Sequence, residues 1–307
     1  MLVDVSHVVE HGMVTYKGLP APLVCDFLSR EQSRSHYAPG TAFHIGKIEM
    51  VANTGTYLDA PFHRYADGND LSELPLERLA NLEGVVIPAE LSKGRAVSRA
   101  AFKGHDLRGK AVLVRTGWDA HWRTDRYFEG HPFLTRDAAE YLLAEGVALV
   151  GIDSLNIDDT GDRSRPVHSL LLAAEVPIVE HLRGLARLPG AGFRFVAVPV
   201  KVKGMGTFPV RAFGIVVEPA TAPACRPSSE CKVNRPSGSV TPKERGLLTS
   251  GQNSTWTLAS GFPPALRVPV TAANFGPPEH PPRGTNNNRF PAARKEARRM
   301  GRLRVGP

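Results

Sequence analysis

The amino-acid sequence predicts a mixed α/β domain rich in β-strands, followed by a tail without a stable fold of its own. Short apolar runs bounded by glycine or polar residues, which are typical of buried strands, outnumber the segments with helical periodicity. Several of these runs follow one another with no helix between them, which argues against a regular doubly wound sheet. The composition changes near residue 219, where prolines and basic residues become frequent.

The expected strands are short and apolar. In chain order they cover residues 2–5, 43–52, 85–87, 111–115, 148–152, 194–203 and 213–217. The run 194–203 (RFVAVPVKVK) places its valines on one face, as a half-buried strand does. Its Pro199 cannot donate a ladder hydrogen bond, so we expect an edge position or a bulge there.

Three segments have helical features. Residues 136–145 follow Thr135, a suitable N-cap, and end before Gly146, a suitable stop. A helix is expected to start near Pro166, because proline suits the first helical position, and to run through VHSLLLAAE. Residues 74–82 are the remaining helix candidate.

The 307-residue chain has the composition of a globular protein, with 42% hydrophobic and 22% charged residues. It has no run of roughly 18 apolar residues, so we expect no membrane-spanning helix. Its start, MLVDVSHVVE, lacks the features of a secretory signal, and its three cysteines are too few and scattered for a disulfide framework. A cytoplasmic location is therefore the expectation.

The net charge of +8 originates in the tail. Residues 219–307 contain 14 Lys and Arg against 4 Asp and Glu, whereas residues 1–218 contain 24 against 26. We therefore predict one folded domain over 1–218, with no electrostatic reason to expect a nucleic-acid partner. The tail, 219–307, holds 14 of the 26 prolines and is predicted to be disordered. It is either a solvated segment, as a shifted reading frame or lost stop codon would produce, or a nucleic-acid-binding arm.

Two stretches contain residue types that suit metal chemistry. In the first, 53–63, Asp59 and His63 lie on a backbone constrained by a glycine and a proline. In the second, His168 falls in the first turn of an expected helix, and Glu180 follows a short apolar run. An imidazole with two carboxylates is a workable ligand set for a divalent cation. From the residues alone, Asp59 could instead cap a turn, and His63 could be a hydrogen-bonded core histidine.

The first stretch, N-T-G-T-Y-L-D-A-P-F-H, resembles the signature H-x-G-T-H-x-D-x-P-x-H of the cyclase-like metal-dependent hydrolases, the family of bacterial kynurenine formamidases and isatin hydrolases. The resemblance continues, in order, through D-V-S-H at 4–7, R-T-G-W at 115–118, G-I-D-S-L-N-I-D at 151–158 and F-P-V-R at 208–211. A later His and Glu, twelve residues apart in the family, match His168 and Glu180. The similarity covers about residues 1–218.

This resemblance implies a swivelling β/β/α fold that commonly holds two metal ions. Asp59 matches a carboxylate that bridges both metals, and Glu180 matches one that also contacts both. His168 matches a ligand of the second metal only. His63, the last histidine of the signature, matches the family's general acid/base.

Asn53 and Tyr57 stand where the signature has the two histidines that bind the first metal. Because an amide oxygen or a neutral phenol is a poor zinc ligand, we expect one retained divalent ion instead of two. Asp59, His168 and Glu180 are its expected ligands, and zinc or manganese is the expected metal. Asn53 and Tyr57 are then remnants of the first metal site or substrate-binding groups.

The resemblance therefore predicts a metal-dependent, arylformamidase-like hydrolase of a small amide, lactam or ester. One divalent ion would activate water, and His63 would act as general acid/base. The alternative is a metal-free or catalytically silent binding protein of the same fold, because two ligand histidines are replaced. A homo-oligomer acting on a small molecule is expected, and the sequence does not name the substrate. Asp153, Asp158 and Asp159 are expected to stabilise loops and not to belong to the site.

Overall fold

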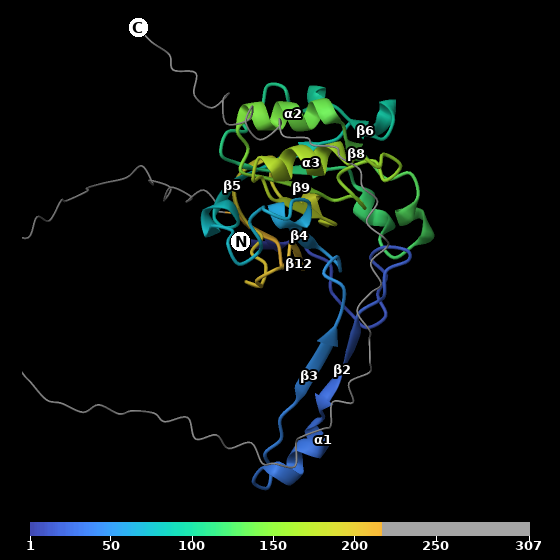
Figure 1. Cartoon of the computed structure of the whole chain (residues 1–307), viewed down its shortest axis with the longest axis vertical. Coiled ribbons are helices and arrows are strands. Elements are labelled where there is room, and N and C mark those ends of the chain that lie inside the picture. Colours follow the sequence, from blue (N-terminus) through green and yellow to red (C-terminus); the bar gives the residue numbers. More distant parts are fainter. Residues whose placement is uncertain (217–307) are drawn as a thin grey trace, which may run out of the picture. The chain divides into compact units, whose positions relative to one another are not determined.

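A computed structural model describes residues 1–216 of the chain (Figure 1). The tail predicted over 219–307 lies outside the described residues, and the domain boundary at 218 stays a prediction. Among the described residues, no helix is both long and apolar enough to span a lipid bilayer.

The described chain is rich in short strands. They are β1 (Leu2–Asp4), β2 (Leu23–Leu28), β3 (Ile45–Glu49), β4 (Tyr57–Asp59), β5 (Leu82–Pro88), β6 (Ala96–Val97), β7 (Ala111–Arg115), β8 (Phe133–Leu134), β9 (Leu149–Ile152), β10 (Ile178–Glu180), β11 (Ala191–Val196), β12 (Thr207–Pro209) and β13 (Phe213–Val216). The α-helices are α1 (Arg30–Ser33), α2 (Arg136–Glu145) and α3 (Pro166–Ala173). The 3₁₀ turns are η1 (Arg34–His36), η2 (Pro61–His63), η3 (Leu76–Arg78), η4 (Leu91–Lys93), η5 (Arg99–Phe102), η6 (Trp118–His121), η7 (Asp125–Phe128) and η8 (Leu185–Arg187).

Nine strands form one mixed sheet in the order β1-β13-β11-β5-β7-β9-β10-β4-β12. The central strands β5, β7, β9 and β10 are parallel, and the strands on both sides of them pair antiparallel. The sheet is curled, so Val3 near one edge and Leu58 near the other belong to the same apolar core. The strand-rich mixed α/β prediction is confirmed.

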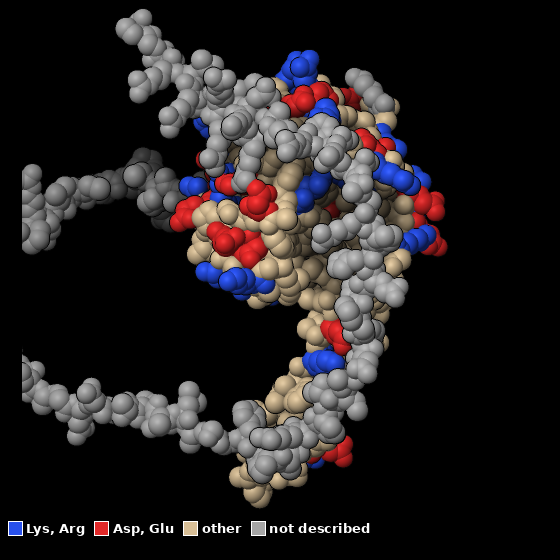
Figure 2. All heavy atoms as spheres, in the orientation of Figure 1, with Lys and Arg blue, Asp and Glu red and all other residues tan. Residues whose placement is uncertain are grey.

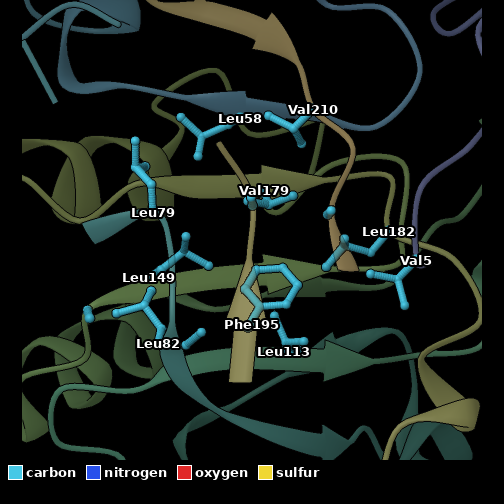
Figure 3. Packing of buried hydrophobic residues seen from close by; sticks show 14 of the residues in the cluster. Val5, Leu58, Leu79, Leu82, Leu113, Leu149, Val179, Leu182, Phe195 and Val210 are labelled. Carbon is cyan, nitrogen blue, oxygen red and sulfur yellow. The ribbon is translucent and has the colours of Figure 1, made fainter. Parts of the chain in front are cut away.

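The two faces of the central strands pack against different cores. In β7, Leu113 points into the core enclosed by the curled sheet, whereas Val112 and Val114 pack on the other side. Figure 3 shows Phe195 at the centre of the enclosed core, beside Leu113. The outer core lies under helices α2 and α3. Burial on both faces explains why this strand reads as a continuous apolar run.

Several predicted elements differ from the structure. The helix predicted over 74–82 is wrong: η3 is a single 3₁₀ turn, and Leu82 already begins β5. Leu74, Leu79 and Leu82 all pack in the enclosed core. Their spacing resembles that of one helical face, but the chain between them forms turns. The strand predicted over 194–203 ends at Val196, and Pro199 forms only an isolated bridge with Val210.

The strand predicted over 43–52 is shorter and lies outside the main sheet. Within the described residues, strands β2 and β3 pair only with each other. With α1 at their turn, they form a hairpin arm, residues 23–49 (Figure 1). The arm exposes seven large apolar side chains, each at least 40% accessible: Leu23, Val24, Phe27, Tyr37, Phe43, Ile45 and Ile48. Apolar exposure of this extent is typical of an interaction surface.

Candidate active site

Strands β4, β10 and β12 bring distant segments to one edge of the sheet. Because side chains alternate along a strand, Tyr57 and Asp59 of β4 point to one face while Leu58 enters the enclosed core. The antiparallel register places Tyr57 opposite Glu180 of β10, and Asp59 opposite Thr207 of β12. This pairing is the reason that side chains over 100 residues apart in sequence meet.

Asp59, His168 and Glu180 converge on one point. The Nε2 atom of His168 lies 3.7 Å from Oδ2 of Asp59 and 3.6 Å from Oε1 of Glu180. All three side chains are buried, and Oδ2 of Asp59 has no hydrogen-bond partner within the described chain. A buried carboxylate oxygen without a partner is costly unless a cation binds it, so this donor set fits a divalent metal ion.

Asp158 orients the imidazole of His168. Its carboxylate accepts hydrogen bonds from the ring Nδ1 of His168 at 2.7 Å, from the backbone N of His168 at 3.0 Å and from the backbone N of Val167 at 2.7 Å. Because Nδ1 donates to Asp158, Nε2 points toward Asp59 and Glu180, and the neutral ring presents its lone pair to a cation bound there. Pro166 at the first position of α3 places His168 in the first turn, as the sequence predicted.

His63 lies beside this cluster, at the end of η2. Its Nδ1 is 2.8 Å from Oγ1 of Thr207, which in turn donates to Oδ1 of Asp59 at 2.5 Å. Since the single hydroxyl proton of Thr207 goes to Asp59, Nδ1 of His63 must be the donor to Thr207. This assignment leaves Nε2 of His63 with a free lone pair.

A glycine permits this position of His63. A Cβ atom on Gly206 would lie 2.3 Å from the backbone N and 2.5 Å from the Cα of His63. The backbone N of Ala60 also donates to the carbonyl of Gly206 at 2.7 Å. Only glycine lets the two backbones approach so closely.

Electrostatics in the cluster favour a positive charge between the carboxylates. Burial alone would lower the pKa of His168, but the hydrogen bond with Asp158 and the negative charges of Asp59 and Glu180 outweigh it and raise the pKa to about 10. Burial raises the pKa of Glu180 to about 7, against the opposing charge of His168. The surrounding carboxylates thus stabilise the protonated, positively charged form of His168. A bound metal ion would place positive charge at the same point.

Tyr57 is part of a phenol network next to Glu180. Its hydroxyl donates to Oε2 of Glu180 at 2.5 Å and lies 2.9 Å from the hydroxyl of Tyr16. Burial, together with the charge of Glu180, raises the pKa of Tyr57 well above 10, so the phenol stays neutral and acts as a donor. Asn53, the other replaced position, lines the adjacent cavity.

A cavity of about 270 Å³ opens beside the cluster. Its walls include His63, Arg64, Arg165, His168 and Glu180, with the remaining lining residues Tyr16, Leu19, Asn53, Tyr57 and Asn156. A substrate in this cavity would therefore contact both the candidate metal ligands and the candidate base.

All six residues singled out from the sequence thus border one region. In the described chain, Asp59, His63 and His168 form a cluster that could hold a metal ion. Each offers one ligand atom, and these atoms lie within 4.8 Å of one another. Glu180 is as near to His168 as Asp59 is. We favour Glu180 over His63 as a third ligand, because the carboxylate of Glu180 is buried, whereas the side chain of His63 is 37% exposed.

Sequence reasoning missed four contributors: Tyr16, Asp158, Gly206 and Thr207. The expectation that Asp158 only stabilises a loop was wrong, because its carboxylate fixes the ring of His168. Asp153 does stabilise a loop, by accepting hydrogen bonds from the backbone of Thr116 and Gly117. The one sequence feature that could have indicated the role of Asp158 is its position shortly before His168, a candidate metal ligand. The roles of Thr207 and Gly206 depend on strand register and on backbone approach, and Tyr16 reaches the site from the segment between β1 and β2.

Known proteins resemble this chain over most of its described length. Kynurenine formamidases of Bacillus cereus and Bacillus anthracis are 26% and 25% identical over 211 and 212 residues, covering 68% of this chain and 95% of each relative. A solved structure described as a potential metal-dependent hydrolase with cyclase activity is 27% identical, with a TM-score of 0.58, covering 71% of this chain and 99% of the other. Isatin hydrolase A from Labrenzia aggregata, bound to benzyl benzoate, shares the fold with a TM-score of 0.61 at 21% identity, covering 71% and 94%.

The model of the Cyclase family matches residues 3–159, which is half of the chain. The match includes Asn53, Tyr57, Asp59 and His63, whereas His168 and Glu180 lie beyond it. The predicted family resemblance is confirmed. The chain belongs to the Cyclase family.

Proposed function

We propose that this protein is a metal-dependent hydrolase of a small amide, lactam or ester. The observation that carries the proposal is the convergence of Asp59, His168 and Glu180 beside a cavity lined by His63. The similarity to kynurenine formamidases and to a potential metal-dependent hydrolase supports a reaction at a carbon–nitrogen bond.

Asp59, His168 and Glu180 would hold one divalent cation, with zinc or manganese as the proposed metal. Such an ion, when bound, supplies Lewis acidity, which activates water and polarises the scissile carbonyl. A borderline metal suits a site with one nitrogen and two oxygen donors. Asp158 keeps the nitrogen of His168 available for this purpose.

The hydrogen bond of Tyr57 is an argument for a site with one metal ion in place of two. Its phenol donates directly to Oε2 of Glu180, so this oxygen is already engaged on the side of the replaced histidine position. We propose that Tyr57 fixes the rotamer of Glu180. Oε1 accepts one hydrogen bond, from the backbone N of Ile157 at 2.6 Å, and would offer its second lone pair to the cation. Asn53, at the cavity wall, is proposed to contact the substrate.

His63 is the proposed general acid/base. Thr207 holds its Nδ1, which leaves Nε2 free to take a proton from water and later to deliver it to the leaving nitrogen or oxygen. Thr207 also bonds Asp59, so the same hydroxyl positions the base relative to a metal ligand.

We also propose that the protein is a homo-oligomer and acts in the cytoplasm. The hairpin arm supports the first point, because its apolar side chains are exposed and, in Figure 2, much of its visible surface is uncharged. Burial of this apolar surface against a second copy of the chain would stabilise the oligomer by about 25 cal/mol for each Å² removed from water.

Hydrolysis of formanilide, with metal content measured on the same sample, tests the function. Wild-type protein with about one divalent ion per chain should hydrolyse it. His63→Ala should lower kcat by about 10²- to 10⁴-fold while retaining the metal. Glu180→Gln should lower both metal content and rate. His105→Ala, an exposed histidine away from the cavity, is the matched control.

Two results would contradict the proposal. Full activity in both variants would remove the assigned roles of His63 and Glu180. A wild-type protein that holds no metal and hydrolyses no amide, lactam or ester would favour the alternative, a silent binding protein of the same fold.

A further inference from the structure

Two guanidinium groups line the cavity beside the candidate metal ligands. Arg64 and Arg165 contribute the permanent positive charges of its wall, while Glu180 is the only carboxylate among the described lining residues. Glu180 is already engaged by Tyr57 and by the backbone N of Ile157 at 2.6 Å. The part of the cavity away from the metal ligands is therefore cationic.

Neither guanidinium forms a salt bridge with a carboxylate of the described chain. Four arginines elsewhere in the described chain pair with carboxylates: Arg95 with Asp159, Arg99 with Asp137, Arg123 with Glu10 and Arg211 with Asp4. Within residues 1–216, Arg64 and Arg165 have no such ion pair. The carboxylate of Asp162 accepts hydrogen bonds from Ser164; it attracts Arg165 electrostatically but forms no salt bridge with it.

Both side chains are positioned through neutral partners. Nη1 of Arg165 donates to Oδ1 of Asn156 at 3.1 Å, and Asn156 also lines the cavity. Nε of Arg64 donates to Oγ of Ser169 at 3.4 Å. Ser169 lies one turn along α3 from Arg165, whose carbonyl accepts its backbone N–H at 2.9 Å. The two arginines therefore flank the start of the same helix.

The backbone of Arg165 is strained. It adopts the left-handed region, with φ 46° and ψ 61°, immediately before Pro166. This conformation is unfavourable in a residue other than glycine and persists where the surrounding structure requires it. Here it directs the chain into α3 and places a guanidinium without a salt bridge on the wall of the cavity.

We propose that Arg64 and Arg165 form a subsite for a carboxylate group of the substrate. This inference rests on the proposed function and narrows it: the preferred substrate is an amide or lactam that carries a carboxylate apart from the bond that is cleaved. A guanidinium presents a planar fork of donors that matches a carboxylate, and it remains charged at every physiological pH. In the reaction, the oxygen of one water bonds to the acyl carbon, the carbon–nitrogen bond breaks, and a proton passes to the nitrogen.

Paired substrates test the subsite. Formanilide is neutral, and the three isomeric formamidobenzoates add a carboxylate at different positions on the same ring. For wild-type protein with its metal, we expect kcat/KM for at least one formamidobenzoate to exceed that for formanilide by about 10- to 100-fold, the range of one or two charge-assisted hydrogen bonds. In the variant Arg64→Met/Arg165→Met, this ratio should fall to near one. Arg99→Met, which removes an arginine that pairs with Asp137, should keep the wild-type ratio.

The possible outcomes separate the two proposals. If wild-type protein hydrolyses formanilide without any preference for a formamidobenzoate, the subsite is wrong and the hydrolase remains. If it hydrolyses neither, the hydrolase is wrong, and calorimetric titration with benzoate decides the subsite: binding lost in the double variant supports it, and equal binding overturns it. Inhibition by inorganic phosphate that depends on both arginines, without a carboxylate preference, would overturn the assignment to carboxylates.

Discussion

Replacing Asp158 with asparagine should weaken metal binding although it changes none of the proposed metal ligands. The carboxylate of Asp158 accepts three hydrogen bonds, two from His168 and one from Val167. An asparagine can retain one acceptor, but its amide N–H groups then face an N–H donor of the His168 ring or backbone. The ring of His168 is released to turn or to move its proton to Nε2, the atom directed at Asp59 and Glu180.

The expected loss of metal affinity is that of a binding histidine whose ring is no longer held in place. Removing an outer partner of a metal-binding histidine typically lowers metal affinity 10- to 100-fold, or about 1.4 to 2.8 kcal/mol. Competition with a chromogenic chelator measures this Kd. Asp159→Asn is the matched control, because Asp159 is the next residue and forms a partly exposed pair with Arg95. Unchanged affinity in Asp158→Asn, or an equal loss in both variants, would refute the orienting role of Asp158.

Three further predictions concern the base, the pH dependence and the arm. Gly206→Ala should lower kcat by about 100-fold by displacing His63, whereas Gly190→Ala, where a Cβ meets nothing within 4 Å, should leave the rate near wild type in steady-state kinetics. The pKa of His168 is about 10 in the folded protein against 6.5 in the unfolded chain, so its protonation stabilises chelator-treated protein fully below pH 6.5 and progressively less as the pH rises to about 10. The Tm of that protein should fall over this range in calorimetry, and a fall of the same size in His168→Gln would contradict the assignment. Phe27→Glu/Ile48→Glu should reduce the mass measured by light scattering to that of a monomer, and an unchanged mass would exclude the arm as the interface.

Local sequence patterns were sufficient for the elements that are buried on both faces or clearly capped. Strand β7 and helix α2 have the predicted bounds, because a two-sided apolar run and a glycine stop are local signals. The mistaken helix over 74–82 shows the limit of such reasoning. Its leucines have a helix-like spacing, yet contacts with distant strands decide the conformation.

The candidate site shows the same division. The signature stretch and the later His and Glu could be recognised in the sequence, and the structure places Asp59, His63, His168 and Glu180 around one cavity edge. Thr207 could not be recognised, because its role depends on lying opposite Asp59 across two antiparallel strands. A register that is set by long-range pairing leaves no mark near the residue itself.

Diffraction data collected at the absorption edge of the metal, from crystals of the protein purified with zinc or manganese, test the central claim most directly. We predict one anomalous peak per chain, at about 2.0–2.2 Å from Nε2 of His168 and from an oxygen each of Asp59 and Glu180. A second peak coordinated at Asn53 and Tyr57, or a cation bound only elsewhere, would contradict it.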